Sequence, residues 1–130
     1  MEERKNFKAW PKGRPKALHY PSIPVYQFLN STAARFPDQV AMRFAGMELT
    51  YQDLLNLSHK FAHALKARGV KKGDRVAIHL PNCPQFAIAY YGLLKLGAIF
   101  VPCSPLMVER ELAYQLNDSG AETLLTLDLL

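Results

Sequence analysis

The architecture follows from residues 75–102, whose sequence is RVAIHLPNCPQFAIAYYGLLKLGAIFVP. The first six of these residues are rich in β-branched and apolar side chains, which is typical of a strand. Pro84 suits the first turn of a helix because proline has no N–H to leave unpaired. The run from Pro84 to Leu96 is apolar nearly all round, as in a covered helix. Residues 98–102 are continuously apolar and predict a strand buried on both faces. This order predicts parallel strands joined by a right-handed crossover.

The same alternation continues on the C-terminal side. Residues 109–117 place Leu112, Ala113 and Leu116 on the inward face of a helix, and Gly120 is suited to end that helix. Residues 122–127 then read as another strand. The order β-α-β-α-β from residue 75 predicts an α/β fold in which helices cover a largely parallel sheet.

Four further elements are predicted on the N-terminal side. Residues 24–36 carry apolar side chains at helical spacing and predict a helix. Residues 40–44 and 48–50 predict a two-stranded ribbon. Thr50 then suits the N-cap of a second helix, because its oxygen can accept a backbone N–H while Asp53 favours the positive helix end. Residues 22–130 therefore form one α/β unit in this interpretation.

Positive charge is concentrated at the N-terminus. The formal net charge of the chain is +5, and residues 1–16 hold six Lys or Arg against two Glu. Residues 17–130 hold ten basic and nine acidic side chains, so their sum is nearly neutral. We interpret residues 1–21 as an irregular basic tail, either solvated or, through Phe7 and Trp10, in contact with an anionic membrane surface. Nucleic-acid binding is not expected, because the cations are not accompanied by a recognisable reading helix.

Several common sites are not expected. Cys83 and Cys103 lack the spacing of a zinc or redox site and predict buried thiols. His59 and His63 are spaced like metal ligands on a helix, but the acid of the HExxH motif is missing and no metal site is expected. Residues 86–103 carry a single charge, yet they are barely long enough to span a membrane and divide into a helix and a strand.

Motifs for nucleotide or acyl chemistry are missing as well. The sequence contains no GxxxxGK[ST] phosphate loop, no GxGxxG after a strand and no GxSxG nucleophile elbow. His79 falls near the carboxyl end of a predicted strand, where α/β proteins bind ligands. A packed or hydrogen-bonded histidine is the commoner outcome at such a position.

Six short runs carry a family resemblance. In chain order they are Phe36-Pro37-Asp38 with Val40-Ala41, Leu49–Leu54 (LTYQDL), Gly69–Ala77 (GVKKGDRVA), Leu80-Pro81-Asn82 with Pro84, Leu94–Ala98 (LKLGA) through Val101-Pro102, and Glu111-Leu112 with Tyr114–Ala121 (YQLNDSGA). Together these runs resemble the N-terminal end of the adenylate-forming (AMP-binding) acyl-CoA synthetases, and the resemblance covers roughly residues 22–127. The last run is similar to the fatty-acyl branch, that is, to the long-chain fatty-acid–CoA ligases.

The resemblance implies an enzyme that activates a carboxylate with ATP and Mg²⁺ to an acyl-adenylate and transfers the acyl group to coenzyme A. Such enzymes hold the phosphates with a Ser/Thr/Gly-rich loop that ends in Pro-Lys-Gly, and they use a lysine near the C-terminus. In this sequence no Ser/Thr/Gly-rich run precedes Pro11-Lys12-Gly13, and no lysine follows Lys95. We therefore expect an N-terminal part of a fatty-acid–CoA ligase, inactive alone, with its partners in the C-terminal part, the fatty acid and coenzyme A. The implied location is cytoplasmic or peripheral to the membrane.

The resemblance offers few site residues. No catalytic residue is expected within this chain. The family commonly has an Asn-Pro pair after the buried strand, whereas here Ser104 precedes Pro105. In relatives that use coenzyme A this loop can lie near its nucleotide, which makes Cys103, Ser104 and Pro105 candidates for that position. The alternative is a plain strand-exit turn fixed by the prolines.

Two other functions stay open at this point. The same chemistry could act on another acid, such as an aryl acid, a short-chain acid or an amino acid. A function of another class is a non-catalytic scaffold or oligomerisation module, with a homodimer contact.

Overall fold

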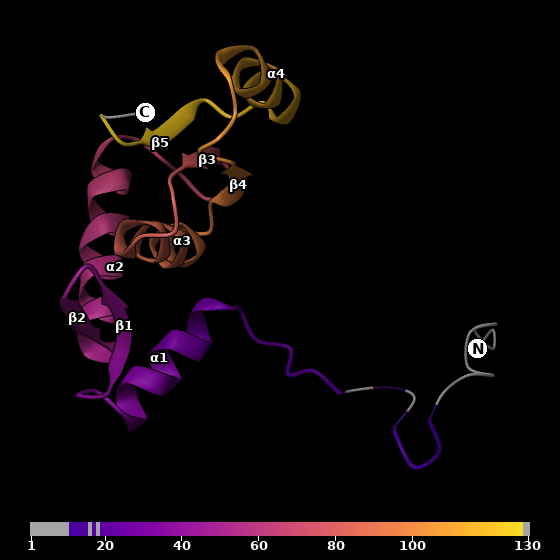
Figure 1. The fold of residues 1–130 in the computed structure, drawn as a ribbon, viewed down its shortest axis with the longest axis vertical. Helices are drawn as coiled ribbons and strands as arrows, with labels where there is room; N and C mark the ends of the chain where they lie inside the picture. The colour runs from indigo at the N-terminus through magenta and orange to yellow at the C-terminus, as the bar shows by residue number, and fades with distance from the viewer. Residues whose placement is uncertain (1–10, 16, 18, 129–130) are drawn as a thin grey trace.

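The computed structural model describes residues 11–15, 17 and 19–128, whose path is shown in Figure 1. In chain order the elements are α1 (Tyr26–Arg35), β1 (Val40–Phe44), β2 (Met47–Thr50), α2 (Tyr51–Ala67), β3 (Arg75–His79), α3 (Pro84–Leu96), β4 (Ile99–Cys103), α4 (Glu109–Ser119) and β5 (Thr123–Thr126). Each helix and strand predicted from the sequence is present, with ends within two residues of those expected. Much of the predicted tail, including Phe7 and Trp10, lies outside the described residues.

The strands form two sheets. β3, β4 and β5 make a parallel sheet in the order β4-β3-β5, and β1 and β2 make a separate antiparallel ribbon. The central place of β3 explains why Val76, Ala77 and Ile78 are all fully buried. The predicted α/β fold with a largely parallel sheet is thus confirmed.

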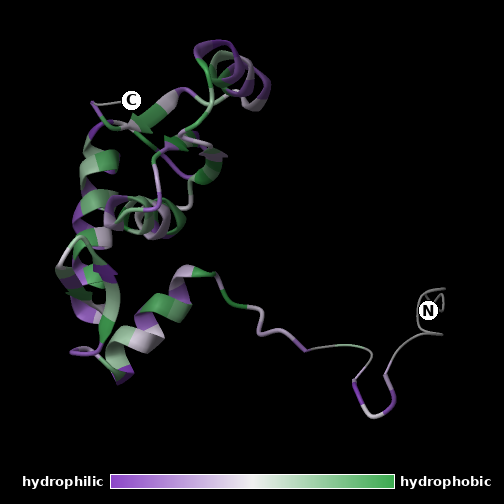
Figure 2. Cartoon of the chain, viewed as in Figure 1, coloured by the Kyte–Doolittle hydropathy of each residue, from purple (hydrophilic) through white to green (hydrophobic). Residues whose placement is uncertain are grey.

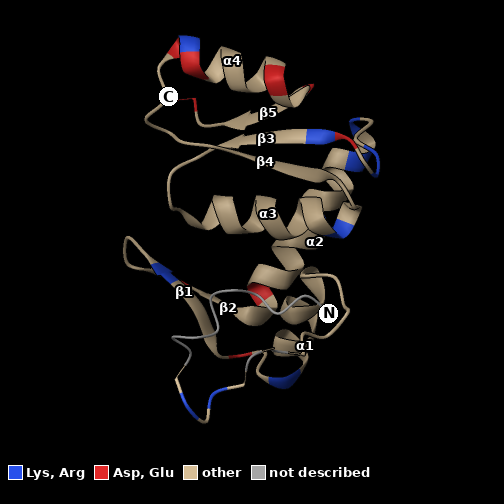
Figure 3. Ribbon diagram, turned by 90° about the vertical axis from the view of Figure 1, so that its right-hand side faces the viewer, with Lys and Arg blue, Asp and Glu red and all other residues tan. Residues whose placement is uncertain are grey.

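Helices cover both faces of the three-stranded sheet, with α3 on one side and α4 on the other (Figure 3). Successive residues of a strand point to opposite faces. Val76 and Ile78 accordingly pack in the larger core with Leu93 of α3, whereas Ala77 packs in a smaller cluster with Leu112 and other residues on the α4 side. The inward position expected for Ala113 is wrong, because α4 packs through Leu112 and Leu116 and leaves Ala113 exposed. α3 is apolar over most of its surface and α4 is more hydrophilic (Figure 2), which agrees with a covered helix and a surface helix.

α2 packs across α3, and Gly92 sets how closely the two helices approach. A methyl group added at Gly92 would lie 3.0 Å from the backbone oxygen of Ser58 and 3.0 Å from the ring of Phe61, both on α2. The Ser58 side chain is 1% exposed and donates a hydrogen bond to the Leu54 carbonyl at 2.7 Å, so it is satisfied within its own helix. The helix crossing therefore depends on a residue without a side chain.

The start of α2 carries a capping box. The backbone N–H of Asp53 donates to Thr50 Oγ1 at 3.1 Å, and the backbone N–H of Thr50 donates to Asp53 Oδ2 at 3.0 Å. The hydroxyl and then the backbone N–H of Thr50 hold the pKa of the Asp53 carboxyl below its usual value. The predicted N-cap is confirmed, and it fixes the point where the ribbon passes into α2.

Cys83 and Cys103 are free and buried, as predicted. Residues 86–103 divide into α3 and β4, as expected. Within residues 11–15, 17 and 19–128, no helix has the length and apolar character needed to cross a membrane.

Candidate functional site at the carboxyl edge of the sheet

The three parallel strands end at one edge of the sheet and bring three polar side chains together there. His79 of β3 pairs in register with Cys103 of β4 on one side and with Thr126 of β5 on the other. Ligands of open α/β sheets bind outside the carboxyl ends of the strands. This edge of the sheet is therefore the candidate ligand-binding site.

His79 is held by one ring nitrogen only. Its side chain is 6% exposed, and its Nδ1 lies 3.2 Å from Thr126 Oγ1. The interpretation of His79 as a hydrogen-bonded histidine is confirmed for that nitrogen. No described residue gives the buried Nε2 a hydrogen bond. Leaving such a group without a partner costs about 1–3 kcal/mol of folding free energy. Nε2 of His79 is therefore free to hydrogen-bond to a ligand at this edge.

The three residues singled out from the sequence face different surroundings. Cys103 is 4% exposed and packs in the cluster on the α4 side, with its Sγ 3.9 Å from the Val101 carbonyl. Burial raises the pKa of the Cys103 thiol, which disfavours a reactive thiolate. Ser104 is exposed and Pro105 is half-buried. Only these last two are open to a ligand arriving at the edge.

A turn fixes the loop that follows β4. Ser104 Oγ accepts the backbone N–H of Leu106 at 3.2 Å, and the Ser104 carbonyl accepts that of Met107 at 3.1 Å. Gln115 of α4 donates from Nε2 to the Pro102 carbonyl at 2.6 Å. The strand-exit turn is thus present, and it holds the Ser104 hydroxyl at the surface of the edge.

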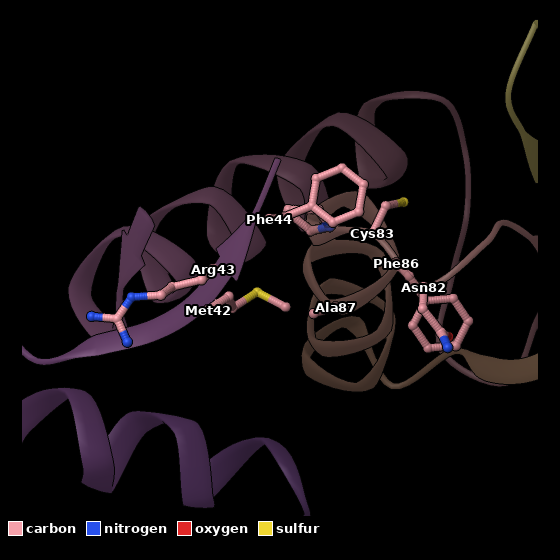
Figure 4. Close-up of a pocket in the computed structure, with 8 residues that line it drawn as sticks. Met42, Arg43, Phe44, Asn82, Cys83, Phe86 and Ala87 are labelled. Carbon is pink, nitrogen blue, oxygen red and sulfur yellow. The ribbon is translucent and has the colours of Figure 1, made fainter. Parts of the chain in front are cut away.

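A hollow beside this edge was not expected from the sequence. It has a volume of about 230 Å³ and is lined by Met42, Arg43, Phe44, Asn82, Cys83, Pro84, Phe86 and Ala87. In Figure 4 the Met42 side chain reaches from β1 toward Ala87 of α3, and the Arg43 side chain points away. Arg43 pairs instead with Glu48, its Nε lying 2.5 Å from Glu48 Oε1. The lining is mainly apolar, so it suits a hydrocarbon group better than a phosphate.

A metal centre has no support at this edge. Across the part of the chain that the structure describes, no three His, Cys, Asp or Glu side chains lie together as a metal would need. His59 and His63 lie on α2, away from the carboxyl edge, as neighbours of Lys95 in a second pocket.

Comparison with known proteins gives the family. Residues 29–129 match the family model described as AMP-binding enzyme. The chain is 45% identical over its whole length to a long-chain-fatty-acid–CoA ligase of Bacillus subtilis, of which it spans 23%. It is 35% identical, over 85% of its length, to a linear gramicidin synthase of Brevibacillus parabrevis, of which it spans 1%.

The solved structures agree with this match. The fold is similar to the N-terminal subdomain of NpsA from Klebsiella oxytoca, with a TM-score of 0.79 and 32% identity, covering 82% of this chain and 28% of that one. VinN in complex with 3-methylaspartate gives a TM-score of 0.77 at 32% identity, covering 80% of this chain and 29% of that one. This chain thus corresponds to a minor part of much longer relatives and belongs to the AMP-binding enzyme family.

Proposed function

We propose that the chain is the N-terminal part of a fatty-acid–CoA ligase, which joins a fatty acid to coenzyme A through an acyl-adenylate. The observation that carries the proposal is the 45% identity, over the entire chain, to a protein named as a long-chain-fatty-acid–CoA ligase. Enterobacterial proteins of the same name are 41–44% identical over 72–76% of the chain. Two linear gramicidin synthase chains are 35–37% identical, which makes a peptide-synthetase adenylation domain the second candidate.

The residues at the carboxyl edge do not fit the phosphates of ATP. Adenylate formation needs cations and N–H donors around the phosphates. Residues 79–82, 103–106 and 126–128, which follow the three strands, contain no Lys or Arg. We therefore assign none of these residues a part in the chemical step of adenylate formation. Its proposed role is to build the sheet and to position the loop after β4 for the rest of the enzyme.

Ser104 and Pro105 are proposed to lie near coenzyme A, because they are the open residues of that loop. Cys103 would act indirectly, since its buried thiol supports the loop from the α4 side. A homodimer contact, a contact of the basic tail with a membrane, and a cytoplasmic location also remain proposals. Residues 1–10, which bear on the tail, lie outside the described residues.

The proposed ligase activity can be tested by comparing several carboxylic acids as substrates. A longer protein containing this sequence would be assayed for pyrophosphate release with palmitate, benzoate, acetate and aspartate, and then for consumption of coenzyme A. We expect palmitate to give the largest release and to consume coenzyme A, and the 130-residue chain alone to give none. A preference for aspartate without coenzyme A would favour the peptide-synthetase alternative. Turnover by the isolated chain would refute its expected inactivity.

Ser104→Ala in the same longer protein tests the loop. We expect KM for coenzyme A to rise about two- to tenfold, the effect of losing one hydrogen bond, with pyrophosphate release unchanged. Ser104→Thr keeps the hydroxyl and should retain the original KM. Ser31→Ala, at an exposed position on α1, is the control. Equal KM values for Ser104→Ala and Ser31→Ala would show that the loop holds no coenzyme A.

A further inference from the structure

A second pocket lies between α2 and α3, at the end of α3 opposite to the carboxyl edge of the sheet. It has a volume of about 240 Å³ and is lined by His59, Ala62, His63, Lys66, Lys95 and Leu96. Ala62 is buried and Leu96 is half-buried, so they form an apolar floor. The four remaining side chains are basic, and no carboxylate belongs to this described lining.

Two basic groups of this pocket are in direct contact. Lys95 Nζ of α3 lies against His59 Nε2 of α2, a ring nitrogen that accepts from the ammonium when it is unprotonated. Burial first, and then the charges of Lys95 and His63, lower the pKa of His59. Burial also lowers the pKa of Lys95. The charges of Lys95 and His63 thus disfavour protonation of His59, and an anion placed among these groups would favour it.

The pocket belongs to a wider basic face. Seven of the ten Lys and Arg in residues 17–130 lie in the second half of α2, in the turn to β3 and at the end of α3, namely Lys60, Lys66, Arg68, Lys71, Lys72, Arg75 and Lys95. Figure 3 shows Lys and Arg gathered at this end of the molecule. Asp74 is the single acid in residues 59–75, and its carboxylate accepts the backbone N–H of Lys71 at 2.8 Å. The net charge of residues 17–130 is close to zero, but their charges are distributed unevenly.

We propose that this pocket binds a phosphate group. Lys66 and Lys95 supply ammonium donors on two sides, and the imidazoles of His59 and His63 supply N–H donors when protonated. Charge-assisted hydrogen bonds of this kind are the strong ones, and their number suits the several oxygens of a phosphate. A divalent cation does not fit this lining, because it would lie beside the ammonium groups of Lys66 and Lys95 with no carboxylate to offset their charge. The proposal is independent of the ligase activity.

Inorganic phosphate is the first probe, with calorimetry at low ionic strength as the measurement. We expect Lys95→Gln to weaken binding about tenfold, as for the loss of one hydrogen bond to a charged group. Lys66 is also exposed, and Lys66→Gln should weaken phosphate binding as well. Lys60→Gln is the matched control, since it removes the same charge beside His59 but does not line the pocket. Equal losses of phosphate affinity for Lys60→Gln and Lys95→Gln would overturn the proposal, because they would indicate only a general attraction of anions to the basic face.

The histidines give a second readout. Sulfate keeps its charge near neutral pH, so a change in its affinity reports on the protein. The groups that face His59 are Lys95 from α3 and His63 from its own helix, and all are basic. Because protonation turns His59 from an acceptor into a donor, sulfate should bind more tightly as the pH falls, and His59→Gln should reduce that dependence. An unchanged pH dependence in His59→Gln would contradict the proposed role of this side chain.

Two sources of phosphate are separated by a vesicle experiment. Vesicles of phosphatidylcholine with phosphatidic acid present the same group on a lipid, whereas free phosphate tests a soluble ligand. Binding of either that depends on Lys95 but not on Lys60 supports the pocket, and the probe that binds identifies the source. Binding of neither probe overturns the proposal.

Discussion

Leu93→Ala is expected to lower the free energy of unfolding by about 2–5 kcal/mol, the range for deleting a fully buried leucine side chain. Leu93 is 0% exposed and lies in the core with Val76 and Ile78 of the central strand. Removing three carbons there loses the transfer free energy and leaves a cavity between α3 and the sheet.

Urea unfolding followed by far-ultraviolet circular dichroism measures this effect. Leu106→Ala is the matched control, because Leu106 is 89% exposed in the loop after β4. The control should change stability by less than about 0.5 kcal/mol. The midpoint for Leu93→Ala should fall with an unchanged slope, which indicates a loss of stability rather than a change in the unfolded state. Equal midpoints for the two variants would show that α3 does not pack on the sheet as described.

Gly92→Val is expected to destabilise the protein by about 1–3 kcal/mol, the usual cost of overpacking. A side chain at Gly92 meets the backbone oxygen of Ser58 at 3.0 Å, and a backbone atom of α2 cannot move without moving the helix. Valine favours a helix more than glycine does, so the loss would occur despite a better intrinsic propensity. Gly92→Ala adds one carbon and should destabilise less than Gly92→Val.

The same unfolding experiment tests Gly92→Val against Ala113→Val. Ala113 is exposed within α4, so this control introduces the same β-branched side chain into a helix without a neighbour to clash with. We expect Ala113→Val to cost less than about 1 kcal/mol, since only the lower helix propensity of valine acts there. A Gly92→Val protein as stable as the original would mean that α2 and α3 are farther apart than described.

The candidate site could be predicted only in part. Cys103, Ser104 and Pro105 were singled out because the resemblance implies that the loop after this strand can lie near coenzyme A, and that assignment stays a prediction. The contact of His79 with Thr126 could not be found, because the two residues are 47 positions apart and nothing local specifies that β5 pairs with β3. The hollow lined by Met42 and Phe86 was missed for the same reason, since the ribbon and α3 meet only through packing.

Local sequence patterns were enough to specify the kind and order of the elements, the cap at Thr50 and the family resemblance carried by the ordered motifs. These features follow from periodicity, turn chemistry and capping, whose free energies are set within a few residues. Three other features became visible only in the folded chain: β3 lies at the centre of its sheet, α2 packs on Gly92, and Lys95 contacts His59. Those pairings depend on how apolar faces are buried against one another across the whole chain, and no local pattern specifies which faces will meet.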